Sequence, residues 1–375
     1  MRLGQRDPFG FERLLYDTTT GHTATSVAGL LAGATPATGD GPGGSHGPTR
    51  PRADRGAIAA HLNGAPLPDR TLLQYIRAVP PGHALLRSAQ GLFTQPVPPP
   101  AAAADAPAGL HARLSASLRR ALASRQRIAL ALSGGLDSAL LLALLCELGA
   151  TDIPAYILVT DLPGYSERDA ALDMAARLGV STRLVPVSAA DFVAALPQAI
   201  AAVEEPLFNL HPVAKLLLAQ AMARDGIELA ISGDGADQVL RRDVSANYLP
   251  LCRALFDAAS VTLLAPFLDA AVVAWLLDRP ADPDKTCLRE IAARLELPAR
   301  LVRGPKHSRL APAMDLRRWA KPDELRALAA QLGLPEPTLS RDEACVRWTT
   351  LALALRQFGV IDTDGAIGHP YPSHS

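Results

Sequence analysis

The chain has 375 residues, enough for two domains with substantial apolar cores. Its 37 Lys and Arg residues balance 37 Asp and Glu residues, so we expect no nucleic acid or acidic membrane as a partner. No stretch approaches the ~18 apolar residues of a membrane span, and the four cysteines show neither CxxC nor metal-ligand spacing. These features indicate a soluble, cytoplasmic protein with reduced thiols.

Proline-rich sequence separates the first hundred residues from the rest. Residues 34–56 are rich in Gly, Pro and Thr and too poor in apolar residues to pack, which predicts a disordered surface loop. The Pro and Ala run after Val97 predicts a semi-rigid linker over 99–109. We therefore place one domain at 1–98 and a second at 110–375.

The second domain begins as an alternation of helical patterns and short apolar strands. The expected strands are 128–132, 155–160, 183–187 and 227–231, the last of which contains the polar Glu228. This alternation predicts an α/β fold with a parallel sheet and crossover helices. From about residue 244 we expect no further strands, only helices that form a layer packed against the nucleotide site.

A tight glycine turn, SGGLDS at 133–138, follows the first of these strands and precedes a second apolar run. Glycines let backbone N–H groups approach a ligand, and the serine hydroxyls and the helix N-terminus converge with them on one anion. Asp137 would repel a bare phosphate, so we interpret it as a ligand of the Mg²⁺ that accompanies ATP. The spacing differs from the G-x-x-x-x-G-K-[ST] loop, which favours adenylation with cleavage between the α- and β-phosphates.

A second acid-bearing turn, SGDGADQ at 232–238, follows the expected strand 227–231. Open α/β sheets bind ligands at the carboxyl edge of their strands. Two such turns after separate strands can each place a carboxylate on one magnesium ion. We therefore expect Asp137 and Asp237 to share it.

Together the two turns resemble the synthetase domain of the asparagine synthetase family, whose loops read SGGxDS and SGxGxDE. Further likenesses in the family's order, over about 115–320, are Glu205-Pro206, PFLD at 266–269, Lys285-x-x-Leu288-Arg289, and Lys306 after Leu297-Pro298. The resemblance implies a parallel-sheet ATP-pyrophosphatase domain of the adenine nucleotide alpha hydrolase-like kind. It also implies that the protein uses ATP and Mg²⁺.

The first domain looks like the closing half of the family's N-terminal glutaminase domain. RDPFG at 6–10 and PPGH at 80–83 carry this likeness. The family's nucleophile is a cysteine directly after the initiator methionine, but here position 2 is Arg2 and no cysteine precedes Cys146. We expect a small, β-rich, truncated and inactive glutaminase-like domain, with ammonia from glutamine excluded as the nitrogen source.

The resemblance also implies roles for single residues. Phosphate contacts fall to Ser133, Gly134, Gly135, Ser138 and Gly233, Mg²⁺ to Asp137 and Asp237, and the nucleoside pocket to Leu132, Leu158 and Val159. The three apolar residues are equally well explained as sheet core. Charge that builds up as AMP departs calls for a fixed cation. Lys306 is the first candidate and Lys285 the second, with an ordinary surface lysine as the alternative. Asp234 or Tyr248 is the candidate base for the attacking amine.

One departure from the pattern of asparagine synthetases indicates a particular subfamily. Gln238 stands where asparagine synthetases have a glutamate, and VLRR at 239–242 replaces a glycine-rich continuation. With NLHP at 209–212 and the incomplete glutaminase half, the chain looks most like lasso-peptide cyclases. That likeness implies ATP-dependent isopeptide formation (macrocyclisation), in which an Asp or Glu side chain of a precursor peptide is adenylated and attacked by the peptide's N-terminal amine. The implied partners are the precursor peptide, a leader-binding protein and a leader protease.

Three alternatives stay open. A β-lactam synthetase-like enzyme would use the same adenylation on a small β-amino acid, and neighbouring genes for a precursor peptide and a cysteine protease would argue against it. An ammonia-dependent asparagine synthetase would use aspartate and ammonium. A non-catalytic nucleotide-binding scaffold would present a precursor peptide to another enzyme, although it has no need of paired acids and a charge-stabilising lysine.

Overall fold

The chain forms two compact units in the computed structural model, which describes residues 1–33, 51–101, 106–162, 167–244, 248–304, 314, 316–318 and 320–361. Unit 1 comprises Met1–Val97, Leu196–Leu210 and Met314–Ser375, and unit 2 comprises Pro98–Ala195 and His211–Ala313. The chain thus leaves unit 1 in the proline-rich segment. Two later segments of the expected second domain nevertheless belong to unit 1, and helix α6 (Ala189–Val203) contributes to both units.

Unit 2 is built on a five-stranded sheet in the order β11-β10-β7-β8-β9, in which every neighbouring pair is parallel. The strands are β7 (Ile128–Ala131), β8 (Ala155–Val159), β9 (Thr182–Pro186), β10 (Leu229–Ile231) and β11 (Thr262–Leu264). The predicted α/β fold with a parallel sheet is confirmed.

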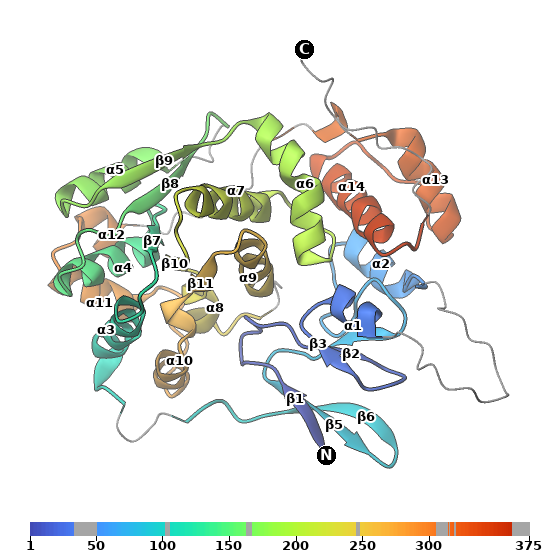
Figure 1. The fold of residues 1–375 in the computed structure, drawn as a ribbon, viewed down its shortest axis with the longest axis horizontal. Helices are drawn as coiled ribbons and strands as arrows, with labels where there is room; N and C mark the ends of the chain where they lie inside the picture. The colour runs from blue at the N-terminus through green and yellow to red at the C-terminus, as the bar shows by residue number, and fades with distance from the viewer. Residues whose placement is uncertain are drawn as a thin grey trace. The chain divides into compact units, whose positions relative to one another are not determined.

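Helices cover both faces of this sheet (Figure 1). On one face α4 (Leu136–Glu147) packs against β7, with α3 (Gly109–Leu122), α5 (Arg168–Arg177) and α11 (Thr286–Arg294) around it. On the other, α7 (His211–Arg224) packs against β8 and α9 (Leu249–Asp257) against β11. The remaining helical segments are α8 (Ala236–Arg241), η1 (Pro266–Leu268), α10 (Ala270–Leu277) and α12 (Ala299–Arg303).

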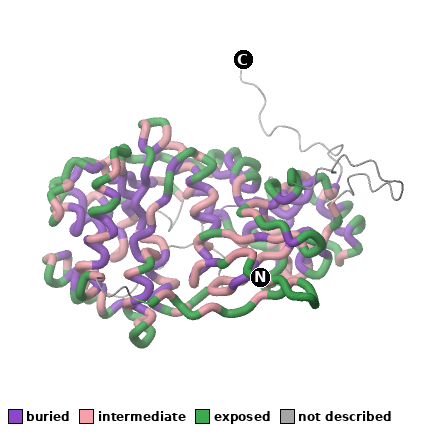
Figure 2. Tube along the Cα trace, turned by 60° about the horizontal axis from the view of Figure 1, so that its bottom comes forward, coloured by how far each residue is buried: buried purple, intermediate pink, exposed green. Residues whose placement is uncertain are grey.

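The centre of unit 2 is the pair β7 and α4. Residues from Ala129 to Ala131 and from Ser138 to Leu145 are all buried, and Figure 2 shows the buried positions along the chain. A strand covered on both faces and a helix that is apolar on all sides both belong inside a domain. Their burial anchors the two ends of the glycine turn that joins them.

Strand β11 contradicts the expectation that no strand follows residue 244. It pairs with β10 at the sheet edge. Its three residues are too few to show an alternating pattern, and a 3₁₀ helix begins at Pro266 soon after the strand ends. The strand therefore cannot be distinguished by its sequence from the helical patterns on either side. The expected strand 227–231 begins only at Leu229, and the Glu228 carboxylate accepts a hydrogen bond from the Arg127 backbone N–H at 2.9 Å.

Unit 1 contains two three-stranded antiparallel sheets. Their strands are β1 (Arg2–Gln5), β5 (His83–Ser88) and β6 (Gly91–Pro96) in one, and β2 (Leu15–Asp17), β3 (Thr23–Ala24) and β4 (Ile76–Ala78) in the other. Its helices are α1 (Val27–Gly33), α2 (Arg55–Leu62), η2 (Leu316–Arg318), α13 (Pro322–Leu332) and α14 (Asp342–Gln357). The first hundred residues are therefore β-rich, whereas their likeness to a truncated glutaminase stays a prediction.

Segments far apart in the sequence complete unit 1. Thr350 of α14 is fully buried, and its hydroxyl oxygen accepts a hydrogen bond from the Leu207 N–H at 3.0 Å. Arg347 donates to the Leu62 carbonyl at the end of α2, also at 3.0 Å. The Glu204 carboxylate accepts the N–H groups of Val27 and Ala28, at the start of α1, at 2.6 and 2.9 Å. These contacts explain why 196–210 and the C-terminal helices group with the first hundred residues.

The predicted disordered loop extends too far toward the C-terminus. Residues 34–50 lie outside the described residues, but Asp54 is buried and caps α2 by accepting the Ala57 N–H. The same carboxylate pairs with Arg70 and Arg77 at 2.5 and 2.9 Å. Polar composition predicts a loop here because it does not reveal that Asp54 is buried and pairs with two arginines. In the expected linker 99–109, residues 102–105 lie outside the described part and α3 begins at Gly109.

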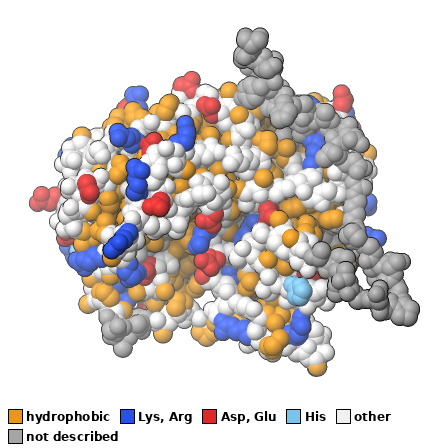
Figure 3. Space-filling model, viewed as in Figure 1, with side chains coloured by type: hydrophobic (Ala, Val, Ile, Leu, Met, Phe, Trp, Pro, Cys, Tyr) orange, Lys and Arg blue, Asp and Glu red, His pale blue; other side chains and the backbone are white. Residues whose placement is uncertain are grey.

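The surface of the described chain carries no single-sign face in the view of Figure 3, where Lys, Arg, Asp and Glu side chains are interspersed. Among the described helices, none combines the length and apolar character needed to cross a bilayer.

Removal of a core side chain from α4 should destabilise unit 2. Leu141 is fully buried, so Leu141→Ala loses apolar contacts and leaves a cavity, which typically costs about 2–5 kcal/mol. Urea unfolding monitored by circular dichroism measures the change. Leu184→Ala, at a β9 side chain that is 48% exposed, is the control and should shift the free energy of unfolding by less than about 1 kcal/mol.

Candidate active site

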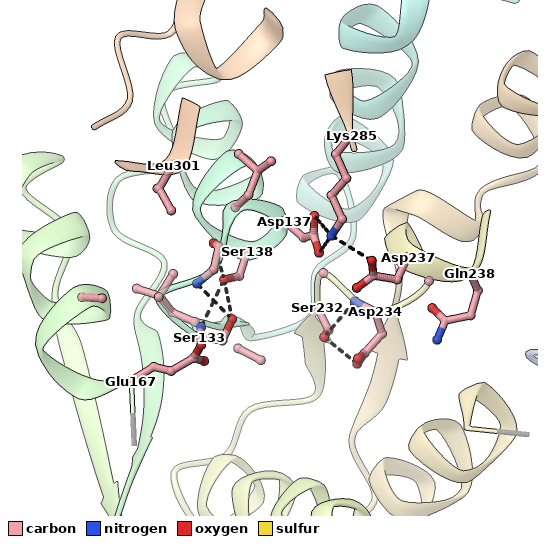
Figure 4. A pocket seen from close by; sticks show the side chains of 18 of the residues that line it. Ser133, Asp137, Ser138, Glu167, Ser232, Asp234, Asp237, Gln238, Lys285 and Leu301 are labelled. Carbon is pink, nitrogen blue, oxygen red and sulfur yellow. Dashed lines mark hydrogen bonds and ion pairs between the residues drawn. The ribbon is translucent and has the colours of Figure 1, made fainter. Parts of the chain in front are cut away.

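The sheet order places both glycine turns at one point. The chain continues from β7 to β8 on one side, whereas β10 lies on the other side of β7. Such a reversal opens a crevice at the carboxyl ends of the strands, where open α/β sheets bind ligands. Because Leu130 of β7 is paired with Ile231 of β10, the two turns start level with each other. A cleft of about 910 Å³ lies there, lined by both turns (Figure 4).

The first turn closes on itself through its two serines. The Ser133 N–H donates to Ser138 Oγ at 3.1 Å, and the two hydroxyl oxygens lie 3.0 Å apart. Gly135 is the N-cap of α4 and makes no side-chain cap hydrogen bond. The first N–H groups of a helix have no intrahelical partner and carry the positive end of its dipole. The turn is therefore built to hold an anion at the N-terminus of α4.

Glycine is required at two positions of the turns because other chain segments come close. A Cβ on Gly134 would lie 2.7 Å from Ala170 Cβ and 3.1 Å from the Glu167 carbonyl oxygen. A Cβ on Gly233 would lie 3.0 Å from both Asp137 Cβ and the Ser138 nitrogen. The second turn thus packs directly on the first turn of α4.

One lysine bridges the acids of the two turns. Lys285 Nζ lies 2.8 and 2.6 Å from the two carboxylate oxygens of Asp137 and 3.3 Å from Asp237 Oδ1. Figure 4 shows the lysine reaching toward both carboxylates. Lys285 is 7% exposed and has a left-handed backbone, with φ +58°. A strained conformation at a non-glycine residue persists only where the surroundings hold it, and it is typical of functional sites.

The two acids also fit a magnesium ion. Their carboxylates lie close enough to contact one ammonium, so they are placed to share a divalent cation. In the described residues no group of three or more His, Cys, Asp or Glu side chains forms a metal cage. Mg²⁺ typically takes one or two protein carboxylates and completes its shell with phosphate oxygens and water.

Asp234 is the centre of a separate, mostly buried cluster. Its Oδ2 accepts hydrogen bonds from Lys215 Nζ and Ser232 Oγ, each at 2.7 Å. Burial by itself raises the pKa of this carboxyl, but the Lys215 ammonium, the Ser232 hydroxyl and His211 outweigh it and lower the pKa below its ordinary value. An acid whose anion is stabilised in this way is a weak base. The geometry favours Asp234 as a fixed counter-ion of Lys215.

The other sequence-predicted residues divide in three ways. Leu132, Leu158, Gly135, Ser138 and Tyr248 line the cleft. Val159 is not among the described residues that line it. Lys306, the first candidate for the catalytic cation, lies outside the described residues and stays a prediction.

Sequence reasoning missed one whole face of the cleft. His211, Ala214, Lys215 and Leu218 of α7 all line it. Their spacing of three, one and three residues is the signal for one helical face, but it reads equally as core. Sequence reasoning also assigned no role to Arg289 of α11 or Arg300 of α12, which both line the cleft.

Comparison with known families agrees with this site. Residues 109–241 match the Asparagine synthase family model. This segment contains β7, both glycine turns and most of the parallel sheet, and it is the part of the chain that is similar to that family.

Individual relatives share only part of their length with this chain. Putative glutamine-hydrolyzing asparagine synthetases of Mycobacterium bovis and Mycobacterium tuberculosis are 34% identical over 111 residues, which are 29% of this chain and 16% of theirs. Among solved structures, an NMN synthetase from Francisella tularensis is similar with 16% identity, a TM-score of 0.35, and coverage of 68% of this chain and 94% of its own. An NH3-dependent NAD synthetase from Campylobacter jejuni gives 16% identity, a TM-score of 0.34, and coverage of 65% and 94%.

Asp234→Asn should remove a stabilisation that depends on pH. Because the folded pKa lies below the ordinary 3.8, the contribution is complete above that value and is lost as the pH falls through the folded pKa. The free-energy difference between wild type and Asp234→Asn, from urea unfolding, should stay constant from about pH 7 to about pH 5 and shrink below about pH 4. A difference that is the same at every pH would show that Asp234 is not stabilised as an anion.

Proposed function

We propose that this protein is an ATP-dependent ligase that adenylates a carboxylate, joins it to an amine, and releases AMP and pyrophosphate. The observation that carries the proposal is the meeting of Asp137 and Asp237 at Lys285, between two glycine turns at the reversal point of the sheet. The match of this same segment to the asparagine synthase family supports it.

The first turn is the place for the phosphates. The N-terminus of α4 presents the positive end of its dipole to an anion at this turn, and the hydroxyls of Ser133 and Ser138 lie beside it. Gly134 and Gly233 have no side chains, which allows neighbouring segments to pack closely against both turns. Leu132 and Leu158 supply an apolar wall beside the turn that suits a nucleoside.

Asp137 and Asp237 would hold Mg²⁺ together with phosphate oxygens. When bound, the ion neutralises charge on the phosphates and on the departing pyrophosphate. Lys285 then has a second role besides pairing with the acids, because a buried ammonium beside the phosphates stabilises negative charge as it develops. Lys306 keeps its proposed role at the tetrahedral step on the sequence resemblance alone.

The attacking amine must reach the acyl group unprotonated. Asp234 is poorly suited to accept that proton because Lys215 and Ser232 hold it as an anion. Tyr248 remains the second candidate. It lines the cleft beside α7, and its ring centroid lies 5.7 Å from that of His211.

For the substrate, we propose a precursor peptide whose Asp or Glu side chain is joined to its own N-terminal amine. The support is the likeness of the sequence to lasso-peptide cyclases, together with Gln238. This amide lines the cleft where asparagine synthetases carry a glutamate, so it removes one negative charge beside the metal-binding acids. A leader-binding protein and a leader protease are the proposed partners.

The test is to incubate the protein with ATP, Mg²⁺ and candidate precursor peptides and to read peptide mass and nucleotide products. We expect a peptide lighter by one water, with AMP and pyrophosphate in equal amounts. ADP as the product would overturn adenylation. Product only with aspartate and ammonium, or only with a β-amino acid, would replace the peptide by the corresponding small substrate. Nucleotide binding with no product from any of these would favour the scaffold.

Asp137→Asn should retain the fold and lose the reaction. The amide keeps the shape of the side chain but cannot supply the negative oxygen that holds the metal, so we expect a fall in rate of about 10²-fold or more. Asp278→Asn, at an 84% exposed side chain directly after α10, is the control for the same chemical change and should keep the wild-type rate. Circular dichroism checks the fold of both variants. Wild-type turnover by Asp137→Asn would refute the metal assignment.

A further inference from the structure

Helix α12 forms part of the cleft wall without being packed into the core. Leu301, Val302, Arg303 and Gly304, at its C-terminal end, all line the cleft. The helix runs only from Ala299 to Arg303, and none of its residues is buried. A helix this short gains little from its own hydrogen bonds. Its position must therefore depend on polar contacts with its neighbours.

Arg289 of α11 supplies such contacts from one guanidinium. Its Nη1 group donates to the carbonyl oxygens of Leu301, Val302 and Gly304 at 3.2, 3.0 and 2.9 Å. The last carbonyls of a helix have no intrahelical partner, so these bonds complete the end of α12. Its Nε donates at 2.9 Å to the carbonyl of Asp284, the residue before Lys285.

The opposite flank of α12 is tied to α5. Arg300 pairs with Asp173 at 2.8 Å and donates to the Ala170 carbonyl at 3.2 Å. Where α12 ends, a Cβ on Gly304 would overlap the carbonyl oxygen of Arg300, and the Gly304 N–H donates to that oxygen at 3.0 Å. The end of α12 therefore requires a glycine at position 304, and the carbonyl oxygen of this same residue accepts a hydrogen bond from Arg289.

We infer that Arg289 is a positioning residue that sets the geometry of Lys285 and of the adjoining cleft wall by holding two backbone segments at once. One segment is 301–304, the α12 end of the cleft wall. The other is the turn at Asp284 that presents Lys285 in its left-handed conformation. The inference deepens the proposed function and rests on it for the reaction that is measured.

The proposed role of Arg289 depends on the forked geometry of its guanidinium donors and not on its charge. A guanidinium directs donors from Nε and Nη1 to separate carbonyls in one plane, whereas an ammonium is a compact point charge. Arg289→Lys therefore keeps the charge and most of the stem but cannot reach all four carbonyls. If Arg289 instead acted as a cation on the phosphates, lysine would replace it well.

The test compares Arg289→Lys and Arg289→Gln with Arg294→Gln, a control at an exposed arginine of the same helix. Three quantities are measured on the full chain: amide hydrogen exchange of 299–304 by mass spectrometry, ATP affinity by calorimetry, and the single-turnover rate. For both Arg289 variants we expect exchange at least about tenfold faster, ATP affinity within about threefold of wild type, and a rate lower by about 10²-fold, the cost typical of a small misplacement of catalytic groups. The control should match wild type in all three.

Two outcomes would overturn the inference. One is a wild-type rate and wild-type exchange in Arg289→Lys, which would show that charge alone suffices. The other is a loss of ATP affinity as large as the loss of rate, which would make Arg289 a nucleotide contact. If the wild-type protein forms no product, the proposed function fails, and the exchange data still decide whether Arg289 holds α12. If Arg289→Gln does not fold, Arg289→Lys carries the comparison.

Discussion

The close approach of the turns after β7 and β10 is the constraint on which the cleft depends. Gly233 meets Asp137 and Ser138 with no room for a side chain, and this contact is possible because the two strands are neighbours in register. Asp137 and Asp237 each lie in the first turn of a helix, α4 and α8. The positive end of a helix dipole favours an acid there, so two acids can stand close together beside the first glycine turn.

Lysines set beside these acids compensate their charge. Lys285 pairs with Asp137 and Asp237, and Lys215 pairs with Asp234 in the second turn. Ion pairs that are mostly buried gain little stability, because desolvation cancels much of their attraction, but removal of one partner leaves an expensive unpaired charge. The pairs therefore restrict which side chains the cleft tolerates.

The parts of this site that could be predicted from the sequence are the parts that local pattern determines. SGGLDS and SGDGADQ are short, follow apolar strands, and carry their chemistry in adjacent residues, so both turns lie where the sequence placed them. β11 was missed because three residues give no period. Arg289 and the α7 face were missed because their roles depend on which segments meet in space. The sequence shows Arg289 only as part of the likeness at Lys285-x-x-Leu288-Arg289, and its four carbonyl partners become apparent only when the position of α12 is known.

The chain returns to unit 1 long after it has left it. Residues 1–97 supply both sheets, but Glu204 caps α1 and α14 lies against α2. On the ribosome the N-terminal strands emerge first, yet α14 follows them by more than two hundred residues. Unit 2 has nearly all of its sequence available by then, including its whole sheet. Synthesis from the N-terminus therefore favours completion of unit 2 first, and unit 1 is completed only when the last helices have been made.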